Sequence, residues 1–132
     1  MNTVPQELNW VDKRAACTAE QMFNELCRGI DNDISTFNAS KGLSDANRFG
    51  ADMMQTGEAV AIGQYGTTPR KRVIVGLSGK EIEVRDDATQ SRWRASVALN
   101  NEGRCILKLE DGTELEQWQF RKKALQGIFF GD

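Results

Sequence analysis

The side chains that most often carry enzyme chemistry are sparse in this chain of 132 residues. It contains no histidine, which removes the commonest general base and the commonest protein metal ligand. Its three cysteines, Cys17, Cys27 and Cys105, include no Cys-x-x-Cys pair, which argues against structural zinc. We interpret all three as buried or half-buried thiols of a reducing cytoplasm. The sequence therefore predicts no metal and no cofactor.

Paired carboxylates and glycine-rich loops also lack a catalytic arrangement. Asp31 and Asp33 are two residues apart on a predicted helix, so their side chains do not converge. The pairs Asp86-Asp87 and Glu110-Asp111 fall in predicted turns, where aspartate favours the local backbone. No Gly-x-Gly-x-x-Gly or Walker spacing is present. We predict no catalytic residues, and the sequence leans towards a protein that is not an enzyme.

Basic side chains could form a stripe on the outer face of the predicted sheet. With Trp93 and Tyr65 nearby, an RNA-binding sheet is one interpretation. Trp93 is predicted on the inner face, however, and glutamates interrupt the basic surface. The formal net charge of the chain is −2, so no global field favours nucleic acid. We expect a solvated face and rank weak nucleic-acid binding third. The stripe comprises Arg70-Lys71-Arg72, Arg92, Arg94, Arg104 and Lys108.

Aromatic and methionine side chains form the candidate ligand site. Such residues adapt to apolar ligands, and a curved sheet around a long helix often leaves a cavity between them. The alternative is that they simply form the core. The candidate pocket residues are Phe23, Phe37, Phe49, Met53, Met54, Trp93 and Trp118.

One long helix must organise these residues. Apolar side chains from Phe23 to Phe37 recur at spacings of three and four, which predicts a helix from Thr18 to Asn38. Thr18 and Gln21 match a capping box, and Cys17 with Met22 matches a hydrophobic staple. Gly29 is unfavourable inside a helix and predicts the close approach of a strand. A short lead-in helix is expected over residues 3–16.

The pattern then changes to the alternation of strands. Residues 48–55 and 58–65 are expected to form a first hairpin, joined at Thr56-Gly57. In the second hairpin, Leu77 lies opposite Ile82 across a Gly79-Lys80 type II′ turn.

Three further hairpin predictions keep the apolar residues on one face. We predict Ile82 opposite Trp93 and Val84 opposite Ser91, with a four-residue turn at 86–89. This register sets two glutamates opposite Arg92 and Arg94. Leu99 is expected opposite Cys105, across a loop in which Gly103 has a left-handed backbone. A similar loop, Asp111-Gly112-Thr113, is expected to join the last hairpin, from Leu109 to Leu115.

The C-terminal stretch returns to helical spacing over about 117–130, with an extended strand as the alternative. We predict one α+β domain over 1–132: a long N-terminal helix packed on a curved five- to six-stranded antiparallel meander, with a short C-terminal helix. Apolar residues near the end either pack on the sheet or form an interface, and we expect a homodimer. The candidate interface residues are Ile128, Phe129 and Phe130.

Both ends of the chain resemble small uncharacterised bacterial proteins of the kind carried on mobile gene cassettes. The resemblance rests on Asn9-Trp10-Val11-Asp12-Lys13-Arg14-Ala15-Ala16-Cys17-Thr18, on Glu116-x-Trp118-x-Phe120-Arg121-Lys122-x-Ala124-Leu125 and on Ile128-Phe129-Phe130. It implies a prokaryotic, cytoplasmic, accessory protein and carries over no catalytic residue and no ligand.

Two functions follow as hypotheses. The first is a non-enzymatic binding or protein-interaction module, with a protein partner or a second copy of the chain. The second is a small-molecule-binding protein or enzyme with an apolar pocket between helix and sheet. No signal peptide or membrane span is evident, so a cytoplasmic location without membrane contact is expected.

Overall fold

The computed structural model describes residues 7–66, 71–87 and 89–131 and confirms the α+β class. Two helices, α1 (Trp10–Ala16) and α2 (Ala19–Lys41), precede one antiparallel sheet, and α3 (Gln117–Phe130) follows it. The sheet has seven strands in sequence order, one or two more than predicted. They are β1 (Phe49–Met53), β2 (Ala59–Gln64), β3 (Arg72–Ser78), β4 (Glu81–Asp86), β5 (Ser91–Leu99), β6 (Cys105–Leu109) and β7 (Glu114–Leu115).

Helix α2 forms where its apolar spacing predicts it. The Thr18 hydroxyl accepts a hydrogen bond from the Gln21 backbone N–H at 3.1 Å, which satisfies one free donor of the first turn. The helix continues three residues beyond Asn38 and ends at Gly42, whose left-handed backbone suits a C-cap. The lead-in helix is shorter than predicted: it begins at Trp10, residues 7–9 are not helical, and 1–6 lie outside the described residues.

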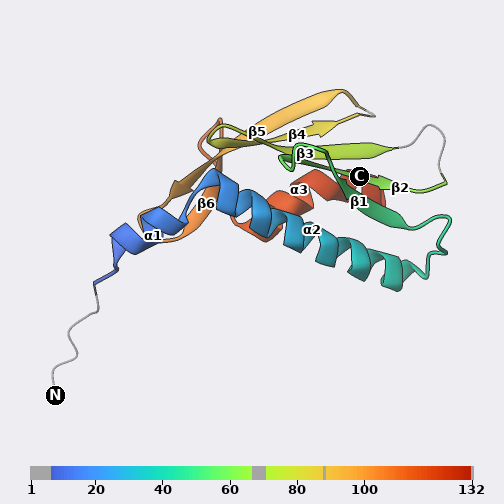
Figure 1. Cartoon of the computed structure of the whole chain (residues 1–132), viewed down its shortest axis with the longest axis horizontal. Coiled ribbons are helices and arrows are strands. Elements are labelled where there is room, and N and C mark those ends of the chain that lie inside the picture. The colour runs from blue at the N-terminus through green and yellow to red at the C-terminus, as the bar shows by residue number, and fades with distance from the viewer. Residues whose placement is uncertain (1–6, 67–70, 88, 132) are drawn as a thin grey trace, which may run out of the picture.

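Helices α2 and α3 cover one face of the sheet, as Figure 1 shows. The inward face of α2 is almost fully buried, and strand side chains from β2 to β6 meet it. Burial of this much apolar surface is the main stabilising term of the fold. The side chains with at most 1 % exposure include Met22, Phe23, Leu26, Ile30, Ile62, Val75, Ile82, Val84, Leu107 and Phe120.

Three of the five predicted hairpins lie where the alternation places them. The first pairs β1 with β2, and the second sets Leu77 opposite Ile82 across the Gly79-Lys80 turn. Leu99 lies opposite Cys105, and Gly103 is left-handed with φ 79°. In the last hairpin Leu107 lies opposite Leu115, whereas the predicted Asp111-Gly112-Thr113 loop required Leu109 there, so this register is wrong by two residues.

The predicted register of β4 against β5 is wrong by two residues. Val84 lies opposite Trp93 and Ile82 opposite Ala95. A shift of two residues leaves every side chain on its predicted face, so the alternation alone does not separate the two registers. The observed register moves the turn to 87–90, where Gln90 has φ 60°. Arg94 still reaches the Glu81 carboxylate, at 3.9 Å.

The free edge of β1 is held by a side chain of α2. The Asn38 amide donates to the Phe49 carbonyl at 3.0 Å and accepts from the Phe49 N–H at 2.9 Å. It thereby satisfies both backbone groups of Phe49, as a neighbouring strand would.

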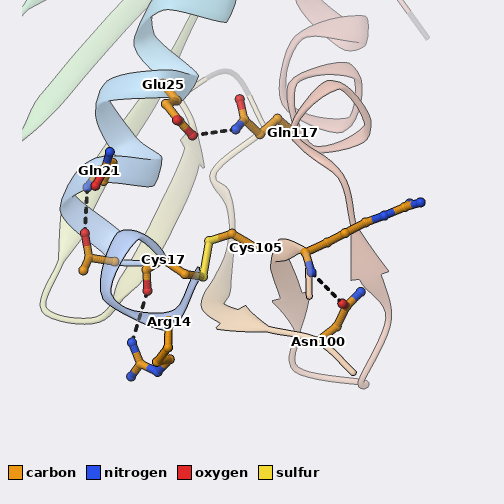
Figure 2. Close-up of a disulfide and its surroundings, with 9 residues drawn as sticks. Arg14, Cys17, Gln21, Glu25, Asn100, Cys105 and Gln117 are labelled. Carbon is orange, nitrogen blue, oxygen red and sulfur yellow. Dashed lines mark hydrogen bonds between the residues drawn. A yellow bond between two sulfur atoms is a disulfide. The ribbon is translucent and has the colours of Figure 1, made fainter. Parts of the chain in front are cut away.

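The thiol interpretation is wrong for two of the three cysteines. Cys17, between α1 and α2, forms a disulfide with Cys105 at the start of β6, 88 residues along the chain (Figure 2). The two residues lie far apart in sequence, so their spacing gives no sign of the bond. Cys27 is the free cysteine. The disulfide fastens the start of α2 to the sheet at the end where α3 also begins.

Candidate functional site

A groove between α2 and α3, on the outside of the helical layer, is the candidate site. Its volume is about 520 Å³. Residues from both helices line it at helical spacing. They are Asn32, Asp33, Thr36, Phe37 and Ser40 of α2, and Trp118, Arg121, Lys122, Leu125, Gln126, Phe129 and Phe130 of α3.

The groove exists because α2 and α3 run side by side in the same direction (Figure 1). The Gln117 side chain donates to Glu25 at 2.7 Å near the start of both helices. Near their ends, the Phe37 and Phe129 rings stack with centroids 4.4 Å apart. These contacts fix the parallel arrangement.

A charged contact closes the middle of the helix pair. The Arg121 guanidinium donates from Nε to Asp33 Oδ2 at 2.9 Å, and both side chains are partly buried. To reach Asp33, the Arg121 side chain crosses α2 at Gly29, where an added Cβ would overlap the guanidinium. Gly29 therefore marks a close approach, as predicted, but of an α3 side chain and not of a strand.

Aromatic rings form the apolar end of the groove. Phe37 also makes edge contacts with Phe49 and Phe130, at 5.4 Å and 5.3 Å between centroids. Phe130 remains 61 % exposed and Trp118 remains 53 % exposed, although both line the groove. Exposed aromatic surface beside a hollow is typical of binding sites.

Two lysine side chains lie at the groove. Lys41 Nζ lies 6.0 Å from the centroids of both Phe37 and Phe130. Lys122 is exposed on the opposite wall. Within the described part of the chain, neither lysine has a carboxylate oxygen within 4.0 Å. Because Asp33 and Arg121 neutralise each other, the two lysines leave the described residues at the groove with a net positive charge.

The seven candidate pocket residues do not surround one cavity. Phe23, Phe37 and Phe49 are buried in the core, whereas Met53 and Met54 are exposed at the β1–β2 hairpin. Of the seven, only two line the α2–α3 groove: Phe37 and Trp118.

Trp93 belongs to a different surface. Its ring packs on Phe120 at 4.9 Å and lies 5.2 Å below the Lys123 ammonium.

The three candidate interface residues take different positions. Phe129 packs inward on Phe37 and Phe49, Ile128 is half-buried against the core, and Phe130 is exposed. Sequence reasoning missed the polar wall of the groove, above all Asp33, Thr36 and Lys122. The spacing of Trp118, Lys122, Leu125 and Phe129 is a helical stripe that could have indicated one wall, but not its partner.

The outer basic stripe is partly neutralised by ion pairs, at Arg72, Arg94 and Arg104. Arg72 Nη2 lies 2.7 Å from Asp87, and Arg104 Nη1 lies 3.0 Å from Glu116. The Arg72 hydrogen bond is the main cause of a lowered pKa of Asp87. Arg70 lies outside the described residues. Such pairing lowers the positive charge that these three arginines could offer to phosphate groups.

Acidic and cysteine side chains are the remaining groups that could carry chemistry. Across the described ranges, no cluster of three acidic, cysteine or histidine side chains could hold a metal ion. Burial, helped by nearby Asp31, raises the pKa of the Cys27 thiol, which disfavours the reactive thiolate. No described helix is both long enough and apolar enough to cross a bilayer.

Comparisons of the chain with protein-family models, with curated proteins and with solved structures found no match. The resemblance to cassette-borne bacterial proteins therefore stays a prediction.

Proposed function

We propose that this protein is a non-enzymatic interaction module that binds a partner along the α2–α3 groove. The observation that carries the proposal is the exposure of Phe130 and Trp118 beside a groove of about 520 Å³. Apolar surface held open by a rigid scaffold favours association, because covering it releases water from aromatic rings. The absence of histidine from the whole sequence supports a role in binding rather than in acid–base chemistry.

A second copy of the chain is a second candidate partner. The exposure of Phe130 supports it, because two such rings could cover one another in a symmetric dimer. The positive charge around the groove opposes it, since a two-fold axis there would bring like cations together. A small apolar ligand is the alternative occupant, and the groove volume is within the range of ligand sites.

The proposed cellular location changes with the cysteines. A reducing cytoplasm followed from three free thiols, whereas disulfides persist mainly in oxidising compartments. The Cys17–Cys105 bond therefore supports an oxidising environment for the disulfide-bonded protein. We propose a cytoplasmic location only for the form in which this bond is reduced.

Partner retention by matched variants tests the proposed function. Immobilised wild-type protein and its Phe130→Ser and Met53→Ser variants are exposed to the same cell extract, and retained proteins are identified by mass spectrometry. Both replaced side chains are exposed, but Met53 lies on the β1–β2 hairpin, outside the groove. We expect a protein retained by wild type and Met53→Ser and lost from Phe130→Ser, with direct binding confirmed by calorimetry.

Two outcomes would count against the module. One is that all three proteins retain the same set. The other is that sedimentation equilibrium gives twice the 14.7 kDa chain mass for wild type and Met53→Ser but not for Phe130→Ser, which favours the homodimer.

A further inference from the structure

The groove has the dimensions of a short helix. Its α3 wall runs from Trp118 to Phe130 and its α2 wall from Asn32 to Ser40. At 1.5 Å per residue these walls are about 18 Å and 12 Å long, which matches two to three turns of a third helix. Two parallel helices present ridges and a groove into which such a helix packs its apolar stripe.

The charge around the groove selects among such helices. Lys41 lies beside the aromatic end and Lys122 beside the α3 wall, both without a carboxylate within 4.0 Å among the described residues. Among the described residues that line the groove, Asp33 is the one acidic side chain, and it is already bonded to Arg121. An occupant with acidic flanks gains from both lysines, whereas a basic one is repelled.

We propose that the partner at this groove is an acidic amphipathic helix of about 8–12 residues. Its apolar side chains, spaced i, i+3/i+4 and i+7, would contact Phe37, Phe130 and Trp118. Its glutamates or aspartates would lie towards Lys41 and Lys122. This inference rests on the proposed function, because it names the partner chemistry of the same groove.

A displayed peptide library tests the partner's chemistry without knowledge of the natural ligand. Random 14-residue segments on yeast are selected for binding to labelled wild-type protein and counter-selected against Phe130→Ser. We expect enrichment of segments with net negative charge and apolar residues at helical spacing. The best segment, made as a fluorescent peptide, gives affinities by anisotropy.

Charge reversal on the protein then separates electrostatic attraction from apolar contact. Lys122→Glu is expected to lower the affinity for the acidic peptide by roughly five- to tenfold and to reduce the salt dependence of binding. The control Lys80→Glu makes the same change in the exposed β3–β4 turn, outside the groove, and should leave the affinity unchanged. Circular dichroism of each variant confirms that it is folded.

Several results would overturn the inference. Enriched segments that are neutral or basic but still require Phe130 would refute the acidic partner and leave the proposed function standing. Enrichment that does not depend on Phe130, or no enrichment, would refute the helix-binding groove, and the retention experiment then decides the proposed function separately. Phe130-dependent binding of dodecanoate without any enriched peptide would assign the groove to an anionic amphiphile instead.

Discussion

Removing the Cys17–Cys105 disulfide should cost the protein a large part of its stability. The bond closes a loop over a sequence separation of 88 residues, which restricts the unfolded chain far more than the folded one. In the chain-entropy model, a loop of this length lowers the entropy of the unfolded state by about 15 cal/mol/K, or ~4.6 kcal/mol at 25 °C. Measured effects are usually smaller, so we expect a loss of about 2–4 kcal/mol.

Urea unfolding followed by circular dichroism measures this loss. The oxidised wild type is compared with reduced wild type and with the Cys17→Ala/Cys105→Ala variant. Both forms without the bond should unfold at lower urea, with a larger m-value because their unfolded chains expose more surface. The matched control is Cys27→Ala, which retains the disulfide and should therefore respond to reductant as wild type does.

Two results would refute the reasoning. Alkylation of the denatured, unreduced protein should modify one cysteine, Cys27, and modification of all three would show that the bond does not form. Unfolding curves that coincide with and without reductant would show that the bond does not restrict the unfolded chain as the entropy argument requires.

The structure supports three further predictions. Asp87→Asn should destabilise the protein by about 0.5 kcal/mol at neutral pH. Because the folded pKa of Asp87 is lowered, its contribution is present above the unfolded pKa and is lost as the pH falls through the folded value, so thermal melts of variant and wild type should converge in acid. The raised pKa of Cys27 predicts iodoacetamide alkylation slower than that of a free cysteine peptide at pH 8, and equal rates would contradict it. Gly29→Ala should stabilise the folded protein by about 1 kcal/mol only when Arg121→Ala removes the overlapping side chain. A double-mutant cycle measured by urea unfolding tests this, and additive effects of the two substitutions would exclude the contact.

Much of the fold follows from local patterns in the sequence. The spacing from Phe23 to Phe37 specifies α2, and the turn glycines Gly79 and Gly103 specify two hairpins, because both signals depend on neighbouring residues only. The register of β4 against β5 does not follow in this way, since two registers keep the same face buried. The alternation of β4 and β5 also leaves out contacts with the third strand, such as the one from Arg72 of β3 to Asp87 in the turn.

The candidate site is harder to predict because it lies between elements that are distant in sequence. Asp33 and Arg121 are 88 residues apart, and the periodicity of each helix leaves the partner of its exposed stripe open. The aromatic residues selected from composition divide between the core and separate surfaces, because composition does not tell which side of a strand or helix faces a cavity. The disulfide escaped prediction for the same reason, since it also joins residues 88 apart.

The contact between Asn38 and Phe49 has a consequence for how the protein behaves at high concentration. An exposed edge strand offers free N–H and C=O groups to strands of other chains, and such edge-to-edge pairing starts aggregation. At Phe49 both groups are occupied by the Asn38 amide, so a foreign strand must first displace it. Asn38 directly follows Phe37, which lines the groove. An occupant of the groove that holds this turn of α2 in place would therefore also keep the Asn38 amide on the backbone groups of Phe49.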